Sequence, residues 1–124
     1  MSWSYALAVA IGGAIGAPLR LLIDSRVSRA TDERGASDFP WGLLAVNAIG
    51  SLLIGIAYAS LDGSLRALLA TGACGALTTY SAYALFIQRT WSRNRVAAWQ
   101  GIVAMPLVCV GACAVGVMAA RGLV

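Results

Sequence analysis

The chain has 124 residues, of which 60% are apolar and 11% are charged. Soluble domains carry about 25% charged residues, so this composition excludes an ordinary soluble domain and predicts a membrane protein. The net charge of +4 comes from nine arginines that lie near the ends of long apolar runs. Because these arginines form no continuous basic stripe, nucleic-acid binding is not expected.

The reactive residue types also narrow the possible functions. The sequence has no histidine, and its three cysteines are isolated inside apolar runs. Zinc sites and catalytic triads need histidine or clustered cysteine, so neither is expected. An isolated cysteine in such a run normally packs as a small apolar side chain. We therefore do not expect an enzyme.

Four apolar runs are long enough to cross a membrane. They cover residues 3–23, 41–61, 65–88 and 97–120. A helix of about 20 residues crosses the hydrocarbon core, and backbone in lipid must satisfy its own hydrogen bonds. The predicted fold is an all-α, multi-pass protein of the cell membrane, with a single domain over residues 1–124. A loop is expected to begin at Asp24.

The connections between these runs differ in arginine content. The predicted loops at residues 24–40 and 89–95 hold six arginines, whereas the opposite side holds only Arg66 and Arg121. Cytoplasmic loops collect arginine, so both termini are expected outside. Small four-helix proteins that insert in both orientations should show almost no such bias. The difference indicates a preferred orientation, and four short helices have so little interior that oligomerisation is expected.

Two polar side chains lie within the first two runs, where lipid makes an unpaired polar group costly. Arg20 follows Pro18 near the end of the first run. It either extends its charge to the membrane surface or forms an anion-attracting vestibule. Asn47 offers uncharged amide hydrogens, which either join two helices or donate to an anion.

The third run contains a strong local signal for a break. Four consecutive hydroxyl residues, 78–81, follow Gly72 and Gly75 at its centre. Hydroxyl side chains compete for backbone partners and glycine weakens a helix, so an interruption is expected; the alternative is an intact helix with hydroxyls bonded to the preceding turn. Unwound backbone at membrane depth must be buried or line a cavity, where its carbonyls suit Na⁺.

Tyr80 and Tyr83 are three residues apart, so a helix places them on one face. The edges of aromatic rings are electropositive. The two rings therefore either pack together or present weak donors to a small anion.

Taken together, these segments resemble the small four-helix fluoride channel family known as Fluc or CrcB. The resemblance rests on three segments that stand in family order at family spacing. They are GGAIGAPLR at 12–20, FPWG at 39–42 followed by NAIGS at 47–51, and GACGALTTYS at 72–81. The fourth run is similar only in length and hydrophobicity.

The resemblance implies a fluoride channel: an antiparallel, dual-topology dimer whose pores lower cytoplasmic fluoride by passive efflux. It implies that the backbone carbonyls of Gly75 and Thr78 hold a structural Na⁺, which is not transported, at the dimer centre. The residues that it places along the fluoride pathway are Asn47, Tyr80, Ser81 and Tyr83. It leaves Arg20 and Thr79 with a vestibule or structural role.

The sequence also departs from the family pattern. Phenylalanine is usual where Tyr80 and Tyr83 stand, and each added hydroxyl could donate to fluoride or block a narrow path. Ala82 and Phe86 replace a common threonine and an acidic residue. The fourth run lacks the usual tyrosine and serine, so a homodimer could have incomplete pores.

Three alternatives remain open. The arginine bias and the missing pore groups favour pairing with an oppositely oriented, paralogous chain over a homodimer. A second possibility is a pore-poor or regulatory subunit of such a heterodimeric channel. A small multidrug exporter has a similar length, but it needs a membrane-embedded carboxylate, and none of the five acids lies at membrane depth.

Overall fold

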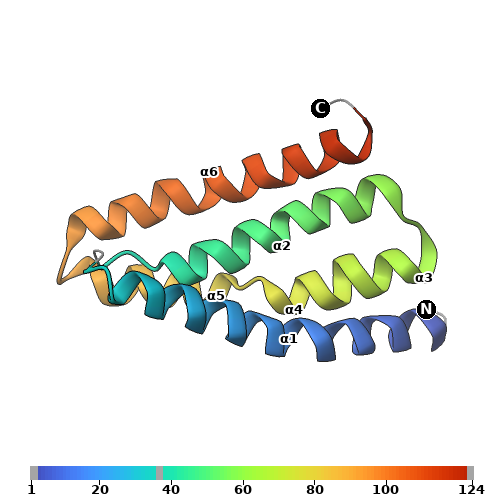
Figure 1. Cartoon of the computed structure of the whole chain (residues 1–124), viewed down its shortest axis with the longest axis horizontal. Helices are drawn as coiled ribbons and strands as arrows, with labels where there is room; N and C mark the ends of the chain where they lie inside the picture. Colours follow the sequence, from blue (N-terminus) through green and yellow to red (C-terminus); the bar gives the residue numbers. More distant parts are fainter. Residues whose placement is uncertain (1–2, 36–37, 123–124) are drawn as a thin grey trace.

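The computed structural model describes residues 3–35 and 38–122, and every regular element within them is helical. In chain order these are α1 (Trp3–Asp32), α2 (Trp41–Ser60), α3 (Gly63–Arg66), the π-helical η1 (Ala67–Cys74), α4 (Gly75–Leu77), α5 (Tyr80–Trp91) and α6 (Arg95–Ala120). Figure 1 shows an elongated bundle in which α1 begins and α6 ends at the same end. The all-helical prediction is confirmed.

Three helices, α1, α2 and α6, are long and apolar enough to cross a membrane. The predicted run 65–88 is instead divided into two helical pieces, because Thr78 and Thr79 are not helical. Together the two pieces extend along the bundle from the α2–α3 turn to the opposite end (Figure 1). The expected interruption is therefore present.

The prediction of a loop from Asp24 is wrong, because α1 continues to Asp32. The residues between these positions are mostly polar but include neither glycine nor proline. The Thr31 hydroxyl donates to a carbonyl one turn earlier, at 3.0 Å. Gly35, with φ +65°, follows the end of the helix in the left-handed conformation that glycine tolerates. The fall in hydropathy marks the end of the apolar stretch and not the end of the helix.

The first helix packs backbone to backbone against η1. A Cβ added at Gly12 would overlap the carbonyl oxygen of Leu68, and one at Gly16 would overlap that of Ala73. A Cβ at Gly72 would lie 2.9 Å from the Cα of Gly12. Small residues allow such approach in lipid, where close packing drives helix association. We call Gly12, Gly16 and Gly72 the glycine seam.

The pairing of α2 with α6 changes character along its length. A Cβ at either Gly55 or Gly116 would overlap a carbonyl oxygen of the opposite helix, so the backbones touch there. Nearer the start of α2, larger side chains separate the two helices. A buried cluster in that region consists of Leu43, Val46 and Met105.

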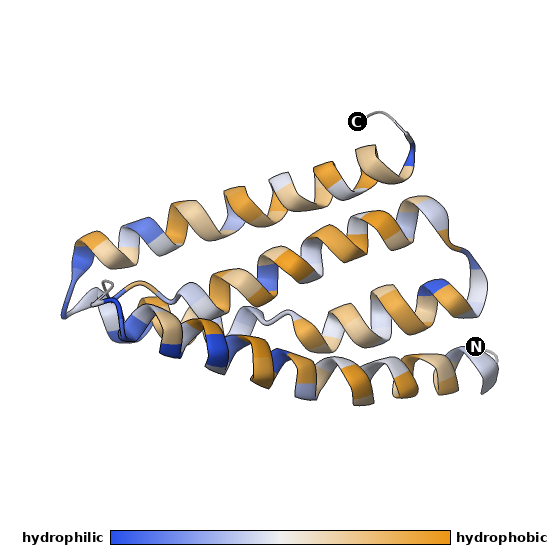
Figure 2. Ribbon diagram, in the orientation of Figure 1, coloured by the Kyte–Doolittle hydropathy of each residue, from blue (hydrophilic) through white to orange (hydrophobic). Residues whose placement is uncertain are grey.

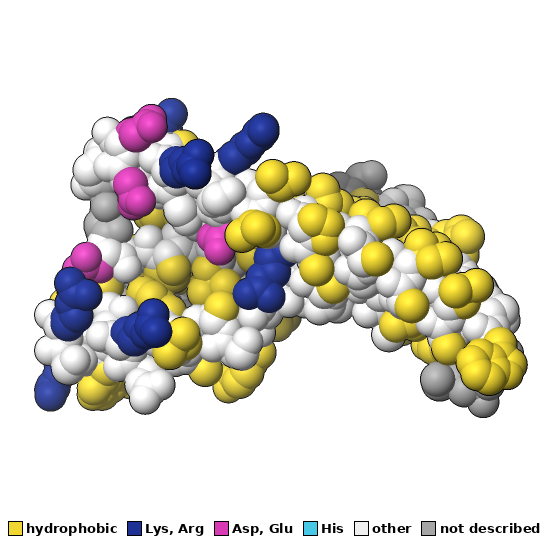
Figure 3. Space-filling view, turned by 90° about the horizontal axis from the view of Figure 1, so that it is seen from below, with side chains coloured by type: hydrophobic (Ala, Val, Ile, Leu, Met, Phe, Trp, Pro, Cys, Tyr) yellow, Lys and Arg dark blue, Asp and Glu magenta, His cyan; other side chains and the backbone are white. Residues whose placement is uncertain are grey.

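Charged side chains gather where α1 ends and α6 begins. Hydrophilic colour concentrates at this end of the ribbon (Figure 2), and the view from below shows most charged groups there, with hydrophobic side chains over the rest (Figure 3). Six arginines belong to this end, whereas Arg66 and Arg121 lie at the other end of the bundle. Large apolar side chains such as Leu21 and Leu107 are exposed, as a lipid-facing surface requires.

Candidate functional site

The break consists of two extended residues between α4 and α5. Thr78 has φ −79° and ψ 159°, and Thr79 has φ −153° and ψ 123°. The Thr78 hydroxyl donates to the carbonyl of Cys74 at 3.0 Å, so it bonds to the preceding turn although the helix stops. The Thr79 hydroxyl accepts from the N–H of Ala82 at 3.3 Å and caps α5. Thr79 is 9% exposed, which fits a structural role.

Asn47 on α2 holds this break through two hydrogen bonds, which we call the Asn47 clamp. Its Oδ1 accepts from the N–H of Thr79 at 2.7 Å, and its Nδ2 donates to the Thr79 carbonyl at 3.2 Å. Asn47 is 6% exposed. A buried backbone group without a partner costs about 1–3 kcal/mol, so the clamp stabilises the extended conformation. Asn47 was expected either to join two helices or to donate to an anion; here it bonds α2 to the non-helical Thr79, and donation to an anion stays a prediction.

The Asn47 clamp and the capping hydroxyl of Thr79 leave two carbonyl groups without the hydrogen bonds that they would accept in a continuous helix. In a continuous helix the N–H of Thr79 would donate to Gly75, and that of Ala82 would donate to Thr78. Here those N–H groups donate to Asn47 and to the Thr79 hydroxyl. Gly75 is exposed and Thr78 is half-buried. Carbonyls freed at a helix break are typical ligands for Na⁺, so Gly75 and Thr78 are the residues of this site that could hold such a cation.

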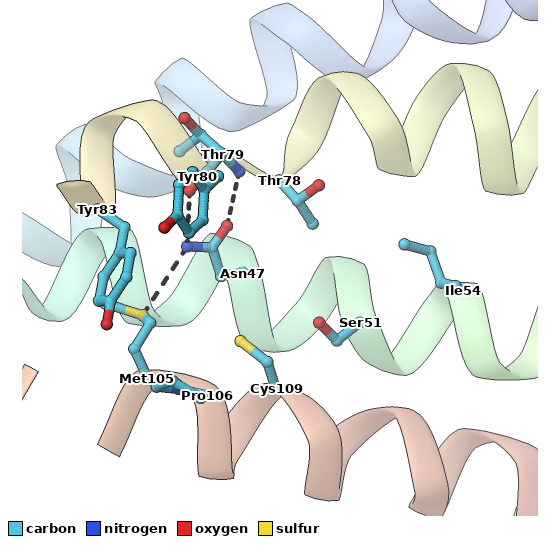
Figure 4. Close-up of a pocket in the computed structure, with 10 residues that line it drawn as sticks. All are labelled: Asn47, Ser51, Ile54, Thr78, Thr79, Tyr80, Tyr83, Met105, Pro106 and Cys109. Atoms are coloured by element: carbon cyan, nitrogen blue, oxygen red, sulfur yellow. Dashed lines mark hydrogen bonds between the residues drawn. The ribbon is translucent and has the colours of Figure 1, made fainter. Parts of the chain in front are cut away.

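Next to the break lies a groove between α2 and α6, with a volume of about 360 Å³. Figure 4 shows its lining side chains, which come from α2, from the break with the start of α5, and from α6. They are Asn47, Ser51, Ile54, Thr78, Thr79, Tyr80, Tyr83, Met105, Pro106 and Cys109. None of these residues is charged, so the groove offers only neutral polar groups.

The polar groups of the groove are an amide and several hydroxyls. Asn47 and Ser51 are one helical turn apart on α2 and face the same side. The rings of Tyr80 and Tyr83 lie with their centroids 5.7 Å apart and their planes tilted by 54°. Tyr80 is 79% exposed, so the groove is open at this edge. This arrangement can donate hydrogen bonds to a small anion without offering a full positive charge.

The structure brings together some of the predicted residues but not others. Asn47, Tyr80 and Tyr83 all line the groove. Ser81 does not line it; its hydroxyl lies 3.2 Å from that of Thr79. Arg20 is half-buried on α1, outside the groove. It forms no ion pair within residues 3–35 and 38–122.

Sequence reasoning missed several residues of the groove, above all those on α6. Ser51 and Ile54 follow Asn47 by four and seven positions, which a helix places on one face. Met105 and Cys109 have the same four-residue spacing on α6. On α2 the spacing could have identified the groove residues, because Asn47 marks the face that turns to the groove. On α6 no polar residue marks the corresponding face.

Comparison with known proteins assigns the chain to a family. The sequence model described as "CrcB-like protein, Camphor Resistance (CrcB)" matches residues 7–120. This chain belongs to the CrcB family. CrcB proteins are ion channels, so the chain is a multi-pass membrane protein and not an enzyme, as the sequence predicts.

Three CrcB relatives show how far the similarity extends. The chain is 35% identical over 130 aligned residues to "Fluoride-specific ion channel FluC 1" of Nitrobacter hamburgensis, covering 99% of this chain and 100% of that protein. It is 43% identical over 98 residues to "Fluoride-specific ion channel FluC" of Hahella chejuensis, with 74% and 72% covered. It is 36% identical over 118 residues to "Fluoride-specific ion channel FluC 2" of Haloarcula marismortui, with 94% and 90% covered.

Proposed function

We propose that this CrcB chain is a subunit of a fluoride-specific channel that lowers cytoplasmic fluoride by passive efflux along the groove. The observation that carries the proposal is a groove without charged side chains that is lined by neutral donors, among them Asn47, Ser51 and Tyr83. Fluoride is small and strongly hydrated, so its path must replace water yet bind weakly enough to release the ion. The three relatives are each named as a fluoride-specific ion channel, which also supports fluoride as the ion.

Four membrane crossings and an antiparallel dimer belong to the proposal. The piece before the break packs against α1 and α2, and α5 after it packs against α6. Together they extend along the bundle as one interrupted crossing would (Figure 1). The high exposure of Tyr80 leaves the groove open on one edge. A second chain supplies the missing wall and separates the ion from lipid.

The proposal also includes a structural Na⁺ at the centre of this dimer. The freed carbonyls of Gly75 and Thr78 would hold it, together with the same groups of the second chain. The exposure of Gly75 supports this arrangement, because the carbonyl must be reachable from outside one subunit. Bound Na⁺ supplies fixed positive charge between the subunits and is not transported.

A heterodimer with an oppositely oriented, paralogous CrcB chain is preferred over a homodimer. The arginine-rich end indicates one orientation. The face that α6 turns to the groove carries Met105, Pro106 and Cys109, and none of these supplies a strong donor. The numbered names FluC 1 and FluC 2 among the relatives support the existence of paired chains.

The test is fluoride efflux from liposomes that contain this chain alone, its candidate partner alone, or both. We expect fast efflux only with both chains. Equally fast efflux from this chain alone would contradict the heterodimer but support the channel. Absence of efflux in all three preparations would contradict the channel.

The second candidate function is a pore-poor or regulatory subunit. The two tyrosine hydroxyls in the groove favour it, since each adds bulk to a narrow path. In that case substitutions along this chain's groove leave the flux of the assembled channel unchanged. The exporter alternative has no support, because no carboxylate lines the described groove.

A further inference from the structure

The amide nitrogen of Asn47, which carries two hydrogens, has two acceptors within hydrogen-bond distance in this structure. Its Nδ2 lies 3.2 Å from the carbonyl oxygen of Thr79 and 3.8 Å from Sδ of Met105. Figure 4 shows the Met105 sulfur approaching the amide from α6, across the groove from the break. An anion that accepts a hydrogen bond from this amide must therefore replace one of the two acceptors.

The two acceptors differ in strength. A peptide carbonyl is a strong acceptor, whereas a thioether sulfur is a weak one. Replacing the Thr79 carbonyl would open the Asn47 clamp and leave a buried backbone group without a partner, which is costly. Replacing the sulfur leaves an almost apolar group behind, and the clamp stays closed.

We infer that Met105 is a positioning residue that occupies the second amide hydrogen of Asn47 until fluoride replaces its sulfur there. The inference rests on the proposed function, because it requires fluoride to reach Asn47. It specifies that the amide hydrogen facing Met105 is the one that donates to fluoride. The other hydrogen keeps its bond to the Thr79 carbonyl and stabilises the fold.

The surroundings of Met105 suit this role. Met105 is 3% exposed and packs with Leu43 and Val46, while Tyr83 packs against the same cluster. A desolvated amide hydrogen without any acceptor is unfavourable, so a weak acceptor keeps the amide oriented between ions. A stronger acceptor would compete with fluoride. Methionine also has three rotatable bonds, which let its sulfur withdraw without moving α6.

The test compares Met105→Gln with Met105→Leu in the complete assembled channel. Fluoride efflux from liposomes is measured over a range of internal fluoride concentrations, and the half-saturating concentration is separated from the maximal rate. The glutamine carbonyl is a strong acceptor, so we expect the half-saturating concentration to rise about two- to tenfold. Leucine offers no acceptor, so the value should fall below that of the unaltered chain.

Met118→Gln is the matched control. It makes the same substitution on α6 at a side chain that is 44% exposed and does not line the groove. We expect its half-saturating concentration to equal that of the unaltered chain. A merely structural role for Met105 would lower the maximal rate through loss of assembled channels, but it would not shift the half-saturating concentration in opposite directions for glutamine and leucine.

The outcomes separate the two proposals. If the channels with methionine, glutamine and leucine at position 105 all show normal efflux and the same half-saturating concentration, the role of Met105 is overturned. The proposed function then still stands. Absence of efflux in the unaltered channel overturns both. If Met105→Gln does not assemble, NMR of the unaltered channel labelled with ¹⁵N-asparagine decides: sodium fluoride should shift one of the two Asn47 amide protons, and a shift of both or neither contradicts the inference.

Discussion

The interrupted segment is held in two different ways on its two sides. Before the break, η1 lies against α1 through the glycine seam, where backbone touches backbone and no side chain intervenes. At the break, the chain is held by the directional hydrogen bonds of Asn47, with a groove beside them. Close packing makes the first region rigid, whereas hydrogen bonding fixes the second and still leaves room for an ion. The two regions should therefore respond differently to substitution.

The largest effect is expected at the glycine seam. Gly12→Val places side-chain atoms against the Leu68 carbonyl, which cannot move without shifting η1. We expect a loss of stability of about 3 kcal/mol or more, measured as thermal unfolding and yield of monodisperse protein in detergent. Gly13→Val is the matched control, because a Cβ at Gly13 meets nothing within 4 Å. Equal stability of the two variants would show that the seam is not close-packed.

The next effect comes from opening the clamp. Asn47→Leu leaves both backbone groups of Thr79 without partners, at a total cost of about 3 kcal/mol, and removes the proposed fluoride donor. We expect lost stability and abolished efflux together. Ser51→Ala lies on the same face but outside the clamp, so it should lower efflux while leaving thermal stability nearly unchanged. An Asn47→Leu variant as stable as the unaltered chain would refute the clamp.

Removal of Na⁺ tests the proposed cation site at the carbonyls of Gly75 and Thr78. A ligand at about 100 times its dissociation constant stabilises a folded assembly by about 2.7 kcal/mol, so exhaustive exchange of Na⁺ for a large organic cation should lower the stability of the dimer by a similar amount. Thr78→Ser keeps the backbone carbonyl and the hydroxyl that donates to Cys74, so it should be mild. A dimer that is equally stable and active without Na⁺ would contradict the proposed cation site.

The smallest effect is expected from single hydroxyl groups in the groove. Tyr83→Phe removes one donor and retains the ring, so we expect efflux to fall about two- to tenfold with no change in unfolding temperature. Fluoride flux through the assembled channel measures this change. An increase in flux would mean that the hydroxyl obstructs the path and does not serve the ion.

Local patterns predicted much of the fold. The apolar runs and the arginine-rich end followed from hydropathy and charge alone. The hydroxyl run at 78–81 predicted the interruption, because competition for backbone partners acts within a few residues. The end of α1 was missed, because a fall in hydropathy does not end a helix and no glycine or proline stops this one before Asp32. The π-helical turns of η1 were missed as well; they coincide with the contact between η1 and α1.

The candidate site was predicted less completely than the fold. Asn47, Tyr80 and Tyr83 could be selected, because polar and aromatic residues are conspicuous within apolar runs. The groove residues of α6 could not be identified from the sequence. Met105 and Cys109 cannot be distinguished from other apolar residues until α6 is placed beside α2. Ser81 was expected along the pathway, but its hydroxyl lies beside that of Thr79 and Ser81 does not line the groove.

By itself the sequence determined that this chain is a membrane protein, and it predicted a preferred orientation and neutral groups along any ion path. These properties depend on composition and on neighbours within one or two helical turns. Only the tertiary structure decided how the break is held, which side chains of α6 line the groove and which amide hydrogen of Asn47 remains replaceable. Those features depend on bonds from Asn47 to residues 32 and 58 positions away in the sequence, and such bonds exist only once α2, the break and α6 are packed together.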